Sequence, residues 1–389
     1  MKISKLGIVV THPIQYQAPL YRYLEAHSSI KPFVLFLTRH GVDESFDPGF
    51  GRSVKYDIPL LEGYDYKFLR NISPKKSPST IIGAINPSLI SEIRKHSFDA
   101  VLFHGWYSIS NWLGFTTSRL SHIPYILRGE TKPDQNEKTS PKLVLKHKAI
   151  SPIVRNAAAC LAIGSLNHQF YIDYGVPPSN IFKAPYSIDT DRFEQAGNKG
   201  RKERTERLLS IGLNPELPTI IYAAKLQPWK RPIDLIKAVD QLDYSVNLII
   251  IGDGVLTSEI TELAYDRQWM KVLGFVNQSE IGEWFGVADI FVLPSEHEPW
   301  GLVVNEAMSA GAIPIVSDKA GCGPDLVTTD TGYRYETGNI GALAMAIKNA
   351  IADGTNADKR FLCQLKSREY SISATANGIE LAMTYITGK

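Results

Sequence analysis

The sequence predicts an α/β fold with two domains, each built on a doubly wound parallel sheet. Short apolar runs alternate with helix-length segments, and 389 residues exceed what one hydrophobic core usually holds. Strands that alternate with helices pair in parallel through right-handed crossovers. We expect strands at 6–10, 33–37, 99–103, 124–127, 159–163, 219–223, 247–251, 290–293 and 313–316, and helices at 17–27, 87–96, 165–173, 233–241, 256–266, 279–287 and 302–310.

A polar, densely charged stretch at 194–207 separates two such series of strands and helices. We interpret it as the start of the second domain or as the hinge region. The prediction is a first domain at 1–190, rejoined by a C-terminal helix at 373–389, and a second domain at 191–372.

Composition excludes several classes of protein. The chain is 44% hydrophobic and 21% charged, which is typical of a globular protein in water. Its longest apolar runs have strand length, and the apolar stretch near the N-terminus is too short for a signal peptide. The three cysteines lack the spacing of a disulfide or zinc framework. A reducing cytoplasm therefore fits this composition. We also expect no cofactor and no essential metal.

Basic residues clearly outnumber acidic ones between residues 70 and 155. No helix-turn-helix, zinc-finger or RNA-binding signature accompanies this excess, so we do not expect nucleic acid as a partner. An anionic small molecule or an anionic membrane surface fits the charge better.

The segment E-P-W-G-L-V-V-N-E, from Glu298 to Glu306, carries the most specific functional signal. It follows a predicted strand and opens a predicted helix, so amides near Gly301 and Leu302 can face an anion at the positive end of the helix dipole. A carboxylate on each side of a bound phosphate suits a nucleotide-sugar, with one for the hexose and one for the ribose. The alternative is a capped surface helix with two solvated glutamates.

Other polar residues also follow predicted strands, where ligands of doubly wound sheets bind. A core-only account does not predict that distribution. The residues are His12 and Gln15 after 6–10, His104 after 99–103, Arg128 and Glu130 after 124–127, and Lys225 and Lys230 after 219–223. We expect His12 and Gln15 to lie near the diphosphate or the acceptor, with Gln15 among the residues that bind the donor.

Taken together, these motifs resemble family 4 of the nucleotide-sugar glycosyltransferases, which retain anomeric configuration and have the GT-B fold. The resemblance covers roughly 185–330 well and the first 180 residues more loosely. It is carried by A-A-K-L-Q-P-W-K-R-P at 223–232, I-I-G-D-G at 250–254, G-F-V at 274–276, A-D-I-F-V-L-P-S-E-H-E-P-W-G-L-V-V-N-E-A-M-S-A-G at 288–311, I-P-I-V-S-D at 313–318 and P-Y-S-I-D-T-D-R-F at 185–193.

The resemblance implies two Rossmann-like domains facing a cleft and transfer of a hexose from a nucleotide-diphosphate sugar. The acceptor would be a hydroxyl of a glycan, a lipid-linked or a small molecule, in surface polysaccharide or glycoconjugate synthesis. It assigns Glu298 to the sugar hydroxyls, Glu306 to the ribose, Lys225 and Lys230 to the diphosphate, the backbone around Phe275 and Val276 to the base, and His104 to positioning the sugar.

Three positions depart from the family pattern. T-H-P-I-Q-Y at 11–16 lacks the usual glycines, Lys225 stands where an arginine is common, and Asp325 replaces a glutamate. Two other functions therefore stay open, a non-catalytic subunit and a GT-B-fold epimerase of nucleotide-sugars. Asp189-Thr190-Asp191 has the spacing of a metal-binding pair, but it lies in the expected domain junction and favours a structural role.

The basic segment at 138–155 suggests peripheral attachment to an anionic membrane that carries a lipid-linked acceptor. The alternative is an ordinary solvated loop or helix. The basic residues concerned are Lys138, Lys142, Lys146, Lys148 and Arg155.

Overall fold

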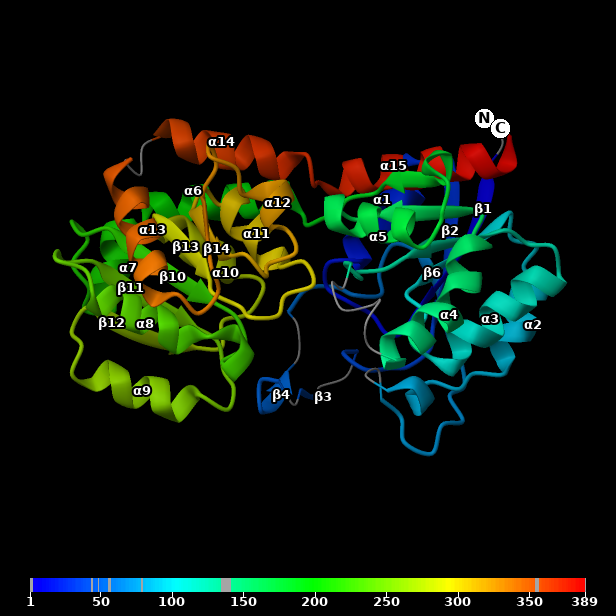
Figure 1. Cartoon of the computed structure of the whole chain (residues 1–389), viewed down its shortest axis with the longest axis horizontal. Coiled ribbons are helices and arrows are strands. Elements are labelled where there is room, and N and C mark those ends of the chain that lie inside the picture. Colours follow the sequence, from blue (N-terminus) through cyan, green and yellow to red (C-terminus); the bar gives the residue numbers. More distant parts are fainter. Residues whose placement is uncertain are drawn as a thin grey trace. The chain divides into compact units, whose positions relative to one another are not determined.

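The computed structural model describes residues 3–42, 45–47, 49–54, 57–77, 80–133, 141–353 and 357–388. The chain forms two compact units, each with its own parallel sheet (Figure 1). The first unit comprises Met1–Ser45, Pro59–Tyr186 and Ile372–Lys389, and the second comprises Phe46–Ile58 and Ser187–Ser371. The predicted α/β class with two parallel-sheet units is confirmed.

The sheet of the first unit has the order β5-β2-β1-β6-β7-β8-β9, and all its neighbouring strands are parallel. Its central strands are buried on both faces, as their continuous apolar runs predict. The strands are β1 (Ser4–Val10), β2 (Ile30–Phe36), β5 (Asp65–Phe68), β6 (Ala100–His104), β7 (Tyr125–Arg128), β8 (Ala159–Ala162) and β9 (Ile181–Lys183).

Helices cover both faces of this first sheet. One core joins the sheet to α1 (Ala18–His27) and α15 (Ile372–Thr387) through residues such as Leu24 and Ile379. The other core lies under α2 (Ser88–Lys95), α3 (Ile109–Leu120), α4 (Pro141–Arg155) and α5 (Ser165–Asp173). The C-terminal helix α15 therefore completes the first unit by packing on α1, β8 and β9, and Figure 1 shows it beside α1.

The sheet of the second unit has the order β12-β11-β10-β13-β14-β15 and is also entirely parallel. Chain order reverses at β10, which pairs with β11 on one side and β13 on the other. Ligands of doubly wound sheets bind at such a reversal. The strands are β10 (Thr219–Ala223), β11 (Asn247–Ile251), β12 (Met270–Gly274), β13 (Ile290–Leu293), β14 (Ile313–Ser317) and β15 (Tyr333–Tyr335).

The charged stretch at 194–207 is helical, running through α6 and α7, and it belongs to the body of the second unit. The Asp189 side chain accepts a hydrogen bond from the Arg192 amide at 3.1 Å and so caps α6. The stretch therefore lies near the start of the second unit, which is one of its two interpretations, and Phe193, Gly197 and Gly200 are buried on one face of α6. The helices of this unit are α6 (Thr190–Lys202), α7 (Arg204–Ser210), α8 (Pro232–Asp240), α9 (Thr257–Tyr265), α10 (Ile281–Val287), α11 (Leu302–Ser309), α12 (Gly323–Leu326), α13 (Ile340–Ala352) and α14 (Ala357–Arg368).

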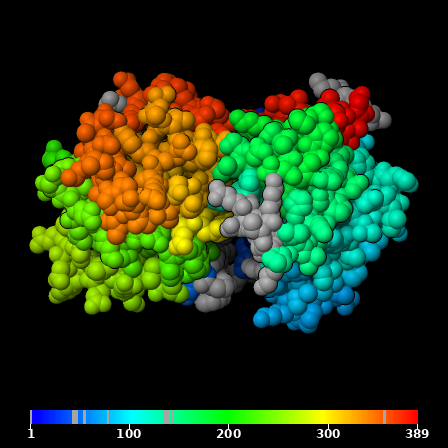
Figure 2. All heavy atoms as spheres, in the orientation of Figure 1, coloured from blue at the N-terminus to red at the C-terminus, as the bar shows by residue number. Residues whose placement is uncertain are grey.

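Two outer features of the second unit were not expected from the sequence. Helices α13 and α14 belong to the orange part of the surface in Figure 2. The strands β3 (Ser45–Asp47) and β4 (Arg52–Val54) form a two-stranded sheet. Nearly all of it lies in Phe46–Ile58, a segment of the second unit that interrupts the first unit in the sequence. Among the described residues, no helix is long and apolar enough to cross a membrane.

Helices α6 and α10 pack through glycines, which gives the first testable prediction. A Cβ on Gly286 would lie 2.1 Å from the Gly197 carbonyl oxygen, so Gly286→Ala must push the helices apart. We expect a loss of about 1–3 kcal/mol in the free energy of unfolding, measured by urea denaturation. Gly341→Ala is the control, because its Cβ would meet only Asn339 Oδ1 at 3.7 Å. Equal urea midpoints for the two variants would contradict this packing.

Candidate functional site

The carboxyl ends of three strands in the second unit carry most of the predicted site residues. Lys225 follows β10, Phe275 and Val276 follow β12, and Glu298 follows β13. Because parallel strands all end at the same edge of a sheet, these residues share one edge. We call this edge of the second unit, with Lys225, Lys230, Phe275, Val276, Glu298, Gly301, Leu302 and Glu306, the donor edge.

A buried ion pair lies at the centre of the donor edge. Lys230 ends a short 3₁₀ turn, Pro228–Lys230, and its Nζ donates to Glu298 Oε2. Glu298 is 9% exposed, so its charge needs this partner. The backbone of Glu298 is fixed by a bond from the Gly321 amide at 3.0 Å. A Cβ at position 321 would lie 1.8 Å from the Pro299 carbonyl oxygen, so this approach requires glycine.

Helix α11 starts at the donor edge directly after this pair. Its N-cap is Gly301, whose φ of +98° is unfavourable for residues with a side chain, and no side chain caps the helix. Trp300 is buried and donates from Nε1 to Asn305 Oδ1 at 3.0 Å, so it packs inside the unit instead of offering a face to a sugar. The first turn of α11 thus presents backbone amides and a positive dipole end at the edge.

Glu306 lies more than one helical turn beyond Glu298 and is partly buried. Desolvation raises the pKa of its carboxyl group to about 7, and the nearby Arg192 guanidinium offsets part of this rise. Arg192 is itself held by Gln278, through the backbone oxygen at 2.6 Å and the side-chain oxygen at 3.1 Å. A carboxylate desolvated in this way gains from hydrogen-bond donors such as sugar hydroxyls.

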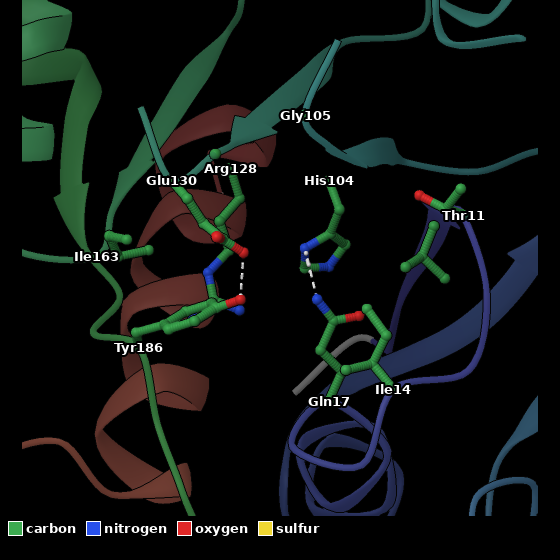
Figure 3. A pocket seen from close by; sticks show the side chains of 11 residues that line it. Thr11, Ile14, Gln17, His104, Gly105, Arg128, Glu130, Ile163 and Tyr186 are labelled. Atoms are coloured by element: carbon green, nitrogen blue, oxygen red, sulfur yellow. Dashed lines mark hydrogen bonds between the residues drawn. The ribbon is translucent and has the colours of Figure 1, made fainter. Parts of the chain in front are cut away.

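The first unit has a pocket of about 200 Å³ at the carboxyl edge of its own sheet. Figure 3 shows Arg128, Glu130 and Tyr186 on one side of it and His104 and Gln17 on the other. The lining residues are Val10, Thr11, Ile14, Gln17, His104, Gly105, Arg128, Gly129, Glu130, Ile163 and Tyr186.

His104 belongs to a closed ring of hydrogen bonds in this pocket. The Gln17 amide lies 3.3 Å from Nδ1, the Tyr21 hydroxyl lies 3.4 Å from Nε2, and the same hydroxyl donates to Gln17 Oε1 at 2.9 Å. One arrangement satisfies all three contacts: Gln17 donates to Nδ1, and Nε2–H donates to Tyr21. Burial, and then the positive charge of Arg128, lower the pKa of His104 to about 3. A histidine with this pKa is neutral at working pH and a weak base.

Arg128 is a buried charged residue of this pocket. On the sequence alone, it stands out only as a polar residue that follows a predicted strand. It is 3% exposed and donates from Nη2 to the Pro185 oxygen at 2.9 Å. Beside it, the Tyr186 hydroxyl donates to Glu130. The sequence signal for Arg128 and Glu130 was their position directly after the predicted strand 124–127.

Other predicted residues of the first unit lie elsewhere. Gln15 is not among the residues that line the pocket, and its role in donor binding stays a prediction. His12 packs edge-on against His40 with ring centres 5.1 Å apart, and burial lowers its pKa to about 4.

The described part of the basic segment at 138–155 begins at residue 141. Lys138 and the side chain of Lys142 lie outside the described residues. Lys146 and Lys148 are exposed on α4, next to Leu145, which is 69% exposed. Arg155 donates from Nε to the Tyr174 oxygen at 2.8 Å.

Comparison with known proteins places the donor edge in a recognised domain. Residues 204–364 match the family model described as glycosyl transferases group 1. A protein of Methanocaldococcus jannaschii named an uncharacterized glycosyltransferase is 27% identical over 318 residues, which are 77% of this chain and 80% of that protein.

Two further relatives match over shorter stretches. The sulfoquinovosyl transferase of Arabidopsis thaliana is 28% identical over 43% of this chain, and a D-inositol 3-phosphate glycosyltransferase of Xylanimonas cellulosilytica is 28% identical over 38% of it. The matched stretches span about a third of these relatives, 32% and 37% of their length.

Solved structures confirm the GT-B prediction for the fold. The HepE protein of Anabaena, crystallised with UDP and glucose, has a TM-score of 0.72 and 18% identity, covering 98% of this chain and 99% of that one. Sucrose-phosphate synthase of Thermosynechococcus elongatus has a TM-score of 0.71 and 16% identity, covering 99% of this chain and 100% of that one.

The raised pKa of Glu306 predicts a pH-dependent cost to stability. The folded state holds the proton up to about pH 7, whereas the ordinary pKa of a glutamate is 4.5, so the folded state binds more protons than the unfolded state between these values. Stability therefore falls as pH rises through that window, and the loss is complete above it. Glu306→Gln removes the ionisable group. The urea midpoint of this variant should therefore rise relative to that of wild type as the pH increases from 4.5 to 8. A constant difference between the two midpoints would refute the shift.

Proposed function

We propose that this chain, which carries a group 1 glycosyl transferase domain at 204–364, is a retaining hexosyltransferase that uses a nucleotide-diphosphate sugar. The observation that carries the proposal is the donor edge, where two lysines, an uncapped helix start and two carboxylates share the end of one sheet. Anion-binding groups flanked by groups that accept hydroxyl hydrogens match the chemistry of such a donor. The names of the relatives support glycosyl transfer, and the UDP and glucose in the HepE structure support this class of donor.

In the proposed reaction, negative charge builds up on the diphosphate as the anomeric bond breaks. Lys225, Lys230 and the first amides of α11 would stabilise that charge. These groups supply the positive charge that a divalent ion supplies in other transferases, so we propose that no metal is essential.

Glu298 has a different task in this proposal. It would accept hydrogen bonds from hydroxyls of the transferred hexose, and its pair with Lys230 ties the sugar position to the diphosphate position. Glu306 would hold the ribose, and the backbone around Phe275 and Val276 the base. His104 would orient the sugar as a neutral group, because a pKa of about 3 makes it a poor general base. The proton of the acceptor hydroxyl would pass to the leaving phosphate oxygen.

The test of this function compares Glu298→Gln and Glu306→Ala with the control Glu296→Gln. Glu296 is a neighbouring glutamate whose side chain is 61% exposed, so its loss should leave kinetics unchanged. Glu298→Gln should lower kcat by about a hundredfold or more, since it removes a contact to the reacting sugar. Glu306→Ala should chiefly raise KM for the donor. Nucleotide release is measured with donor and acceptor, in the presence of EDTA.

Other outcomes of this assay identify the alternatives. Wild-type kinetics in both variants would refute the assignment of the motif. Donor binding without nucleotide release in any acceptor mixture would indicate a non-catalytic subunit, and conversion of the donor sugar without release would indicate an epimerase. Activity that is lost in EDTA and restored by manganese would contradict the metal-free mechanism.

We further propose a glycan, a lipid-linked or a small-molecule acceptor, with attachment of the protein to the inner face of an anionic membrane. Lys146 and Lys148, exposed on α4 just after the exposed Leu145, support the membrane part. Sedimentation with vesicles should show binding to anionic lipid and weaker binding after Lys146→Glu and Lys148→Glu. Equal binding to neutral and anionic vesicles would contradict attachment by charge.

A further inference from the structure

The segment around β4 packs onto the donor edge of the second unit, although it comes from the N-terminal part of the sequence. Phe50 stands between two glycines in the turn before β4, and Gly51 has a φ of +67°. This turn lies outside the matched stretch 204–364, so nothing in the family motif accounts for it. It brings an aromatic ring to groups that the proposed function assigns to the nucleotide.

Phe50 contacts two of those groups directly. Lys225 Nζ lies 4.7 Å from the centre of the Phe50 ring, at cation–π distance. The Phe275 ring meets the Phe50 ring edge-on, with centres 5.2 Å apart. Lys225 is assigned to the diphosphate and residue 275 to the base. The Phe50 ring therefore lies between the expected places of the two ends of a nucleoside diphosphate.

Three further contacts hold this segment across the loops that follow β10, β11 and β12. Gln227 Nε2 donates to the Gly49 carbonyl oxygen at 2.6 Å, after β10. Arg52 Nη1 donates to Asp253 Oδ2 at 3.1 Å, after β11. Beyond β12, the Ser279 amide and hydroxyl donate to the Asp57 carboxylate.

We infer that Phe50 sets the donor affinity of this protein by competing with the nucleotide for the donor edge. The inference rests on the proposed function, since it takes Lys225 and Phe275 as nucleotide-binding positions. The diphosphate must draw Lys225 away from the Phe50 face, and the base and ribose must displace the ring from Phe275. Each of these contacts is lost on binding, so their strength is subtracted from the affinity for the nucleotide.

The test measures UDP binding by titration calorimetry in wild type, Phe50→Ala and Asp57→Ala. Phe50→Ala removes the competing ring, and Asp57→Ala releases the anchor at Ser279 without touching Lys225 or Phe275. Phe50→Ala should bind UDP about tenfold more tightly, the size expected for one cation–π contact and one aromatic pair. Asp57→Ala should shift the affinity in the same direction by less, because Gln227 and Arg52 still hold the segment. Tyr265→Ala is the matched control, because Tyr265 is an aromatic residue of the same unit with 89% exposure, and it should bind UDP as wild type does.

Hydrogen exchange gives a second readout that does not depend on a variant folding well. In wild type, amides of residues 49–54 should exchange faster when UDP is added, because the nucleotide displaces the segment. Slower exchange would mean that the segment closes over the nucleotide, and would overturn the inference.

The affinities separate this inference from the proposed function. Weaker or unchanged UDP binding in Phe50→Ala, with clear binding in wild type, overturns the competition alone. UDP binding seen only in Phe50→Ala and Asp57→Ala supports it strongly. If neither wild type nor these variants bind UDP, ADP or GDP, the proposed donor function fails and this inference fails with it.

Discussion

The pairing of β10 with β13 is the constraint on which the donor edge depends. Ile220 lies opposite Ile290 and Ile221 opposite Phe291, so two strands distant in the sequence end side by side. The loops that follow them then bring Lys230 and Glu298 into contact, although 68 residues separate them in the chain. Each charge is partly withdrawn from water, and removal of either would leave the other without its partner. The tight turns at Gly301 and Gly321 keep Glu298 in that position.

The same edge shows why the sequence predicted this half of the molecule well. Strands such as 219–223 and 290–293 are continuous apolar runs buried on both faces. Runs of this kind are typical of the central strands of a parallel sheet covered by helices. Edge strands such as β12 and β15 were missed because they carry lysine, arginine and tyrosine at partly exposed positions. Helix α6 was missed because its buried face consists largely of glycines, which contribute no hydrophobic signal.

The site residues that the sequence did not predict are those whose position depends on contacts between distant parts of the chain. Nothing in P-G-F-G-R at 48–52 indicates that Phe50 contacts Lys225, because that contact depends on where the chain places a distant segment. The ring of Gln17, Tyr21 and His104 has a similar origin. The sequence placed Gln15 near the site because it follows β1, but Gln17, at the start of α1, is the glutamine whose side chain reaches His104. A shift of two residues at a helix start is beyond the precision of a periodicity argument.

The two units differ in the charge that they offer to a ligand. The donor edge combines lysine charges with a helix start and carboxylates, which suits a nucleotide-sugar. The pocket of the first unit instead holds a buried arginine and a neutral histidine in fixed hydrogen bonds, which suits orientation of a polar group. This division of tasks agrees with a transferase in which charge stabilisation belongs to one sheet and positioning to the other.

The most direct test of the donor edge is a crystal structure with a bound nucleoside diphosphate. The account predicts phosphates within hydrogen-bond distance of Lys225, Lys230 and the first amides of α11, with the ribose on Glu306 and Phe50 moved away from Phe275. A nucleotide bound at another place, such as the His104 pocket alone, with the Lys230–Glu298 pair and Phe50 unchanged, would contradict it.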